Sequence, residues 1–233
     1  SGGQSGTSFA VTPELETTYF WRVDAVNGGV IPGKVWNFTT EPVGRPIPAQ
    51  SIVATASSHS AGNGPEKTID GSGLGPNDLH SNDLADMWLS EASEPNEAWI
   101  QYDFNRPYKL HQMLVWNLNG PVIFSGFGLR DVTIAYSSDG IEWVEMDDTF
   151  ERAPGSPDYS HLPAVEFGGA VAKMVRITAK NNWGSGPAFN LYGLSEVRFL
   201  AIPLSAHLPM PEFGTTDVAL DTMLSWRAGR ESA

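Results

Sequence analysis

The chain has 233 residues, 41% of them hydrophobic, and a formal net charge of −13 from 27 acidic and 14 basic side chains. This composition predicts a globular protein with a sizeable core, and it argues against nucleic acid or an anionic membrane as the main partner, since both need a basic patch. Cysteine is absent, which excludes disulfides, thiolate metal sites and cysteine nucleophiles. No apolar run is long enough for membrane insertion.

Residues 17–40 predict a pair of β-strands. In "TTYFWRV" the residues Tyr19, Trp21 and Val23 share one face, "NGG" supplies a turn, and "KVWNFTT" alternates again. The pair resembles the last two strands of a fibronectin type III-like sandwich, which needs about seven strands. The resemblance implies that the chain begins inside such a domain.

A proline-rich linker, residues 41–51, precedes a central region without a convincing helix. No window of 12 residues there combines a helical apolar period with capping residues. Short alternating segments with turn signals between them predict an all-β sandwich instead. The expected strands are 98–104, 112–117, 131–138, 142–146, 164–168, 172–180 and 195–200.

The C-terminal residues 209–228, "PMPEFGTTDVALDTMLSWRA", resemble the opening strands of the same fibronectin-like domain. The predicted organisation is therefore the end of one such domain, a central domain and the start of a second such domain. These regions span residues 1–43, 44–203 and 204–233. The alternative is that both ends are strands of the central domain.

Six segments of the central domain occur in a recognisable order: "ATASSHS", "EKTIDGSG", "DMWLS", "AWIQYDF", "YSSDGIEW" and "LSEVRF". Together they resemble a discoidin, or coagulation-factor type C, domain with the galactose-binding-like fold. Bacterial members of this fold mostly resemble family 32 carbohydrate-binding modules. In the proteins that contain them, they usually lie next to fibronectin-like repeats. The resemblance implies a discoidin-like β-sandwich (jelly roll) in a larger, secreted or cell-surface, bacterial multidomain protein.

The resemblance also implies a structural calcium ion. In the family, the aspartate of the "DG" turn lies beside the glutamate that opens the last strand, and both bind Ca²⁺ together with backbone carbonyls. The matching residues are Asp70 and Glu196, with the hydroxyls of Thr68, Ser72 and Ser195 as further donors. The alternative is that Asp70 only stabilises a turn and Glu196 is a solvated edge residue.

One segment departs from the family pattern. Asp70 and Trp88 are separated by "GSGLGPNDLHSNDLADM", where a typical module has a short connection. The longer loop carries His80, Asn82 and Asp83, and it is expected to reshape the binding face.

Sugar recognition needs an aromatic face for the ring and planar polar side chains for the hydroxyls. Three loops at one end of the predicted sandwich supply such groups, and the expected ligand-binding residues are His80, Asn82, Asn117, Asn119, Asn181 and Trp183. Trp183, flanked by Asn and Gly, is expected to be the stacking platform, with a buried hydrophobic plug as the alternative. Phe189 lies in the same loop, whereas Trp88 and Trp99 are expected in the core.

The predicted function is a non-catalytic carbohydrate-binding module that tethers a larger protein to glycans, with galactose-type or amino sugars implied by the family. A discoidin adhesion module without sugar specificity is the alternative. A fragment of a glycoside-processing enzyme is a third class. No G-x-S-x-G, H-E-x-x-H or P-loop motif supports catalysis.

Overall fold

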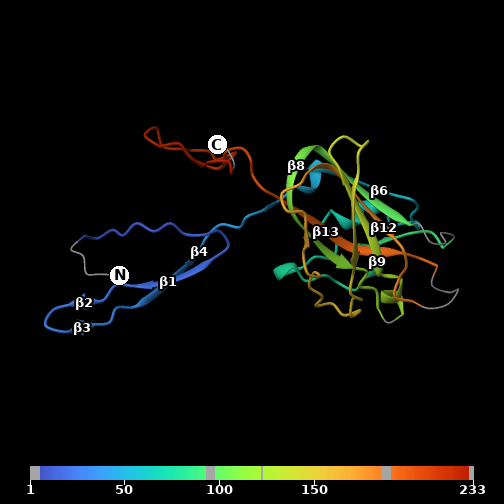
Figure 1. Ribbon diagram of the computed structural model, residues 1–233, viewed down its shortest axis with the longest axis horizontal. Helices are drawn as coiled ribbons and strands as arrows, with labels where there is room; N and C mark the ends of the chain where they lie inside the picture. Colours follow the sequence, from blue (N-terminus) through green and yellow to red (C-terminus); the bar gives the residue numbers. More distant parts are fainter. Residues whose placement is uncertain (1–5, 93–97, 122, 185–189, 231–233) are drawn as a thin grey trace. The chain divides into compact units, whose positions relative to one another are not determined.

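The computed structural model describes residues 6–92, 98–121, 123–184 and 190–230. The chain forms two compact units, Ser1–Val43 and Gly44–Ala233. Figure 1 colours the first unit dark blue and runs through the second from light blue to red.

The first unit is built on a two-stranded hairpin. Its two strands, β1 (Thr18–Arg22) and β4 (Val35–Thr39), pair antiparallel. Within the connection between them, the short strands β2 (Ala25–Val26) and β3 (Val30–Ile31) also pair antiparallel. The Trp21 and Trp36 rings lie opposite each other with centroids 4.7 Å apart. The strand pair expected over residues 17–40 is therefore present, while its membership of a fibronectin-like domain stays a prediction.

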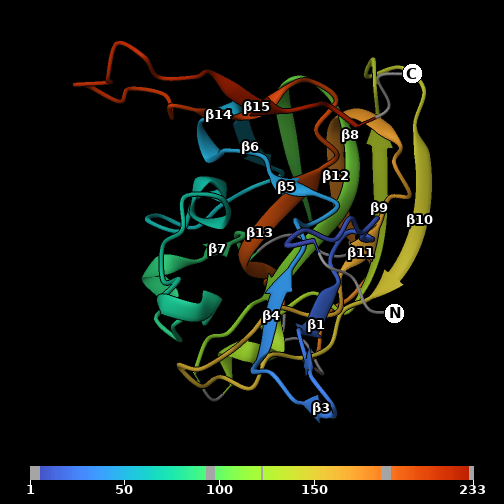
Figure 2. The same cartoon turned by 90° about the vertical axis from the view of Figure 1, so that its left-hand side faces the viewer.

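The second unit contains one nine-stranded sheet that is antiparallel throughout its named pairings. Its path runs β10-β9-β12-β8-β13-β5, with β6 and β11 also on β8, and β7 on β13 (Figure 2). The strands are β5 (Arg45–Pro46), β6 (Ile52–Ala56), β7 (Trp88–Leu89), β8 (Trp99–Asn117), β9 (Asp131–Ser137), β10 (Val144–Thr149), β11 (Val165–Glu166), β12 (Val171–Ala179) and β13 (Gly193–Ala201). The all-β prediction is confirmed.

Strand β8 holds the sheet together. Its first half pairs with β6 and β12, and its second half pairs with β13 and β11. The prediction of separate strands at 98–104 and 112–117 is wrong, because the backbone between them stays extended. Pro107 lies where the register shifts between Ala172 and Met174, a place where a missing ladder donor is tolerated.

The core lies between the two halves of this sheet. Alternate residues of β8 point inward, and the fully buried Tyr102 and Phe199 rings meet edge to face with centroids 5.1 Å apart. Trp88 is buried as expected. Trp99 is only partly buried, and the Arg176 guanidinium lies 5.0 Å from its ring centroid, so its assignment to the core is wrong.

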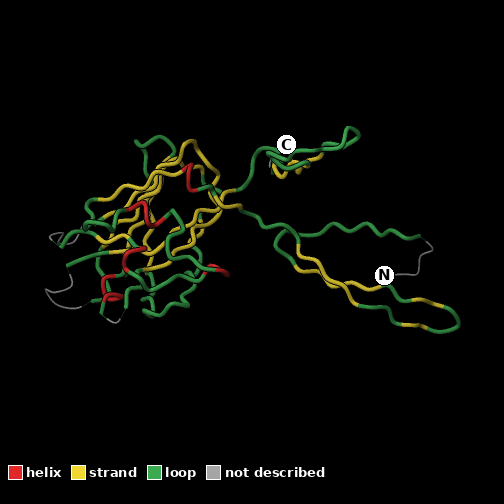
Figure 3. Tube along the Cα trace, turned by 180° about the vertical axis from the view of Figure 1, so that it is seen from behind, coloured by secondary structure: helices red, strands yellow, loops and turns green. Residues whose placement is uncertain are grey.

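The helices of the described residues are all short 3₁₀ turns, drawn red in Figure 3: η1 (Ala49–Ser51), η2 (Pro65–Thr68), η3 (Pro76–Asp78), η4 (Leu84–Asp86) and η5 (Phe124–Phe127). Within those residues no helix has the length and apolar character needed to cross a membrane. Beyond β13, the chain adds the strand pair β14 (His207–Met210) and β15 (Ser225–Arg227).

Deleting residues 1–43 is expected to leave the second unit folded, because among the described residues its main buried core runs from Ile47 to Ala201. The melting temperature of that unit, followed by calorimetry, should change little. A longer deletion of residues 1–52 also removes Ile47 and Ile52 from the core, and it should clearly lower the melting temperature of the second unit. Loss of cooperative unfolding after the shorter deletion would contradict this division.

Candidate functional site

Two buried asparagines organise the loops beyond the end of β8. Asn119 donates through Nδ2 to the carbonyls of Ser81 at 2.8 Å and Ser156 at 2.6 Å, and its Oδ1 accepts from the Gly155 amide at 2.9 Å. Asn119 is fully buried. It therefore joins the long loop after Asp70 to the loop that carries Gly155.

Asn117, two residues earlier in the chain, has a similar role. Its Nδ2 donates to the carbonyls of Leu129 at 2.7 Å and Glu151 at 2.8 Å, and its Oδ1 accepts from the Leu118 amide. Both amide side chains thus already have protein partners. The structure gives them a loop-supporting role, and direct contact with a sugar stays a prediction for each.

The long loop is anchored rather than extended into solvent. His80 is fully buried, its backbone amide donates to the Tyr159 carbonyl at 2.8 Å, and burial lowers the pKa of its imidazole. Asn82 is partly buried and donates to the Gly155 carbonyl at 3.1 Å. Asp83 accepts from the Ala85 amide and so caps η4. His80, Asn82 and Asn119 therefore lie together around one network.

Trp183 lies in the loop between β12 and β13 and is partly exposed. Its Nε1 donates to the Phe150 carbonyl at 2.9 Å, and the Arg130 guanidinium carbon lies 5.0 Å from its ring centroid. These contacts fix the ring while leaving some of it accessible. The Trp183 amide donates to the carbonyl of Gly128, close to Asn117.

Asn181 is exposed beside this tryptophan, and its amide is bound to Asp131. Asn181 Nδ2 donates to Asp131 Oδ2 at 2.7 Å, while its Oδ1 accepts from the Asp131 amide at 3.0 Å. Hydrogen bonds from Asn181 and then Thr149 hold the pKa of the Asp131 carboxyl below its ordinary value. Phe189 lies outside the described residues.

Arg130 is a residue that the sequence interpretation missed. It is exposed immediately before β9, and its guanidinium faces the Trp183 ring. An arginine beside an accessible aromatic ring offers several N–H donors next to a stacking surface. The sequence signal for Arg130 was its position, a basic residue just before a strand in a very acidic chain. That Arg130 lies beside Trp183 became evident only from the fold.

Asp70 and Glu196 meet at a second place, along a cavity of about 270 Å³. Glu196 is 4% exposed, and among the described residues its buried Oε2 has no hydrogen-bond partner. Burial first, and the Asp70 carboxylate second, raise the pKa of Glu196 to about 8. The cavity and the unpartnered Glu196 oxygen leave room for a cation, which would favour the ionised form of Glu196.

The turn around Asp70 accounts for the local geometry. Asp70 Oδ1 accepts from the Ser72 amide at 2.7 Å, and Gly71 has φ of +78°, a conformation that favours glycine. The Thr68 hydroxyl is fully buried and bonds the Pro65 carbonyl and the Tyr102 hydroxyl. Thr68 is therefore a weaker metal-donor candidate than the two carboxylates.

No group of three or more His, Cys, Asp or Glu side chains is gathered as metal ligands within the described ranges. Any cation at this turn would have only the Asp70 and Glu196 carboxylates as acidic ligands. The remaining coordination would come from backbone carbonyls, hydroxyls and water, which suits a hard oxygen-seeking ion such as Ca²⁺.

The sequence of the chain matches the model of a known protein family. The F5/8 type C domain matches residues 53–193, which is more than half of the chain. This match covers the loop after Asp70, all of β8 and Trp183. No curated protein matches the chain.

Solved structures share the fold at low sequence identity. The family 32 carbohydrate-binding module of Clostridium perfringens NanJ, in complex with galactose, has a TM-score of 0.52 at 16% identity, covering 68% of this chain and 99% of its own. CpGH89CBM32-5 from Clostridium perfringens, in complex with GalNAc-β-1,3-galactose, has a TM-score of 0.51 at 16% identity. The match covers 66% of this chain and 99% of that structure's chain. A His 62 mutant of the lectin binding domain of Lectinolysin, complexed with Lewis b, has a TM-score of 0.52 at 17% identity. The match covers 69% of this chain and 99% of that structure's chain.

Proposed function

The chain belongs to the F5/8 type C domain family, and from this premise we propose that it is a non-catalytic carbohydrate-binding module. The observation that carries the proposal is the partly exposed Trp183 ring. Its Nε1 donates to the Phe150 carbonyl, and the Arg130 guanidinium lies beside the ring. The similar folds named above were solved with galactose, GalNAc-β-1,3-galactose and Lewis b. Galactose-type and amino sugars are therefore the ligand class to test first.

The proposed chemistry follows from the two exposed groups. The accessible area of the indole packs against the apolar side of a pyranose ring, and Arg130 donates to its hydroxyls. The buried Asn117 and Asn119 keep the surrounding loops in place. Asn82 and Asn181 are partly or fully exposed in these loops, and we propose that they limit which sugars fit. His80 is fully buried, and we propose that it acts only by supporting the long loop.

We further propose a structural calcium ion at Asp70 and Glu196. The support is the buried, unpartnered Glu196 oxygen and the raised pKa that Asp70 helps to cause. The ion would neutralise both carboxylates and fix the turn after η2 to β13. Ser72 and the neighbouring carbonyls would complete the oxygen ligands.

The setting is proposed as a secreted or cell-surface, bacterial multidomain protein, in which this module tethers a partner domain to glycans. The hairpin β1–β4 and the strands β14 and β15 are proposed to belong to fibronectin type III-like neighbours. The sequence resemblances in residues 17–40 and 209–228 support this.

The test is a titration of galactose and GalNAc-β-1,3-galactose into the unsubstituted chain and into Trp183→Ala. Losing the ring is expected to weaken binding by at least about fivefold, since burying an aromatic side chain contributes about 1–3 kcal/mol. Measurable affinity for weakly bound sugars would then largely disappear, while the melting temperature stays close to that of the unsubstituted chain.

Trp143→Ala is the matched control. Trp143 is also partly exposed, its Nε1 donates to the Gly140 carbonyl at 3.3 Å, and the Arg176 guanidinium lies 5.2 Å from its ring. It lies at the β9–β10 turn, so its loss should leave sugar binding unchanged. Equal binding by Trp183→Ala and the unsubstituted chain would refute the platform. Absence of binding to any glycan on an array would instead favour the adhesion alternative.

A further inference from the structure

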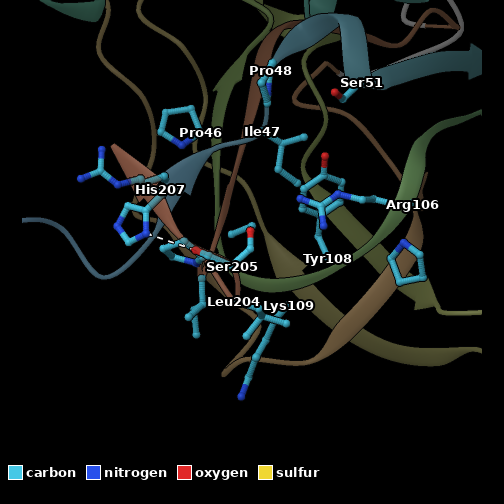
Figure 4. A pocket seen from close by; sticks show the side chains of 15 residues that line it. Pro46, Ile47, Pro48, Ser51, Arg106, Tyr108, Lys109, Leu204, Ser205 and His207 are labelled. Atoms are coloured by element: carbon cyan, nitrogen blue, oxygen red, sulfur yellow. Dashed lines mark hydrogen bonds between the residues drawn. The ribbon is translucent and has the colours of Figure 1, made fainter. Parts of the chain in front are cut away.

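A second cavity, of about 280 Å³, lies away from the loop cluster. Figure 4 shows side chains from three segments around it: residues 45–51, residues 106–109 of β8, and residues 201–207 after β13. Nothing in the proposed function uses these residues.

Strand β13 separates this cavity from the candidate sugar site. The strand begins at Gly193, beside Leu89 and close to the end of β8 at Asn117, and it ends at Ala201, which lines the cavity. The strand has nine residues, and each of the eight steps between them rises about 3.3 Å, so the two places are roughly 26 Å apart along β13. One ring-sized ligand cannot occupy both.

The charge of the cavity is opposite to that of the chain. Arg45, Arg106 and Lys109 line it together with His207, and none of the lining residues is acidic among those that the structure describes. The whole sequence has 27 acidic and 14 basic side chains. Because charges are screened beyond about 8 Å at physiological salt, the local cluster decides which ions enter. The cavity therefore favours an anion.

The walls suit a ring as well as a charge. Tyr108 donates its hydroxyl to Asn105 Oδ1 at 3.1 Å, and the Arg106 guanidinium carbon lies 4.6 Å from the tyrosine ring centroid. The tyrosine is thereby held in place with the guanidinium next to it. Four prolines add rigid apolar surface, since their φ is fixed by the ring: Pro46, Pro48, Pro107 and Pro203.

The size of the cavity limits the ligand. Sites for small molecules usually have volumes of about 300–1,000 Å³, so this cavity matches a single sugar ring better than a long chain. Guanidinium groups bind carboxylate and sulfate oxygens through paired N–H donors, and lysine adds a point charge. Charge, walls and size thus agree on one small anionic ring.

We propose that this cavity is a second saccharide site, specific for a sugar residue that carries a carboxylate or sulfate group. Arg106 and Lys109 bind the anionic group, with Arg45 at the same wall, and the ring packs against Tyr108 and the prolines. The choice of a saccharide rests on the proposed function, whereas the preference for an anion rests on the cavity. The module would then hold a mixed neutral and acidic glycan at two ends.

The test compares ligands on the full chain. Galacturonate and galactose-6-sulfate are titrated beside galactose, their neutral counterpart, and beside inorganic sulfate. Both acidic sugars should bind at least about tenfold more tightly to the cavity than galactose does. Addition of 1 M NaCl should weaken the binding of both acidic sugars. Inorganic sulfate should bind more weakly than galactose-6-sulfate, because it lacks the ring.

The variant Arg106→Gln/Lys109→Gln keeps the side-chain stems and removes both charges. It is expected to lose at least about tenfold in affinity for the acidic sugars and to keep its affinity for galactose. Lys34→Ala/Lys173→Ala removes two charges outside the cavity and should change neither. Melting temperatures of all variants verify that the fold is retained.

Each other result overturns the proposal in a distinct way. Unchanged acidic-sugar binding by the Gln variant shows that the cavity is not the site, and loss in Trp183→Ala instead assigns that binding to the candidate sugar site. Inorganic sulfate binding as tightly as galactose-6-sulfate shows a bare anion site. Galactose binding without any preference for acidic sugars overturns this inference alone, and no sugar binding overturns it together with the proposed function.

Discussion

Chelation of calcium is expected to lower the melting temperature of the chain by about 5–10 °C, and Glu196→Gln is expected to abolish that difference. A ligand that binds only the folded state stabilises it by about 2.7 kcal/mol at a hundredfold excess over Kd. In a domain of this size, 1 kcal/mol corresponds to about 2–4 °C. The measurement is differential scanning calorimetry in calcium and in chelator.

The exposed Asp70 and the buried Glu196 together make a further distinction possible. Glu196 is buried beside Asp70, which helps to raise its pKa, so the carboxylate is unfavourable there without a cation. In chelator, Glu196→Gln should therefore melt no lower than the unsubstituted chain. In calcium it should melt lower.

Glu145→Gln is the control for the loss of one carboxylate. Glu145 is exposed on β10, so this variant should keep the full response to calcium. Identical melting of the unsubstituted chain with and without chelator would rule out the calcium site and leave Asp70 as a turn-stabilising residue only.

Asn119→Ala is expected to destabilise the second unit by about 2–4 kcal/mol. The change removes the side chain that bonds Ser81, Ser156 and Gly155, and leaves their partly buried backbone groups without this partner. A buried polar group that loses its partner costs about 1–3 kcal/mol, and water entering the loops recovers some of that. Chemical denaturation, compared at constant slope, measures the difference.

Asn82→Ala is the matched control for that experiment. It removes the same group from the same loop system, but Asn82 is only partly buried and makes a single bond to Gly155. A loss of no more than about 1 kcal/mol is expected. If Asn119→Ala costs no more than Asn82→Ala, the network around Asn119 does not hold the long loop.

Sugar binding and stability should respond separately in these variants. Trp183 contacts Phe150, Gly128 and Arg130, whereas Asn119 contacts the loops that carry Ser81 and Gly155. Trp183→Ala removes area that contacts the ligand. Asn119→Ala loosens the loops that support the sugar site, so its effect on binding follows from its effect on folding.

The strands with one buried face were predictable from the sequence. Alternation along residues 131–138, 172–180 and 195–200 matches β9, β12 and β13 to within about two residues, because side chains of a strand point alternately to core and solvent. The order of weak motifs also predicted the F5/8 type C family. The resemblance placed Asp70 next to Glu196, and both line one cavity.

The tertiary structure alone decided which polar groups stay available to a ligand. Asn117 and Asn119 follow a strand and look accessible in the sequence, yet their partners lie 34 and 36 residues further along the chain, at Glu151 and Gly155. Likewise, Arg45, Arg106 and Lys109 form a basic cavity only after β5, β8 and β13 come together. Local periodicity records which face of a strand is apolar, but loop hydrogen bonds and charge clusters depend on contacts between segments far apart in sequence, and those form only in the folded chain.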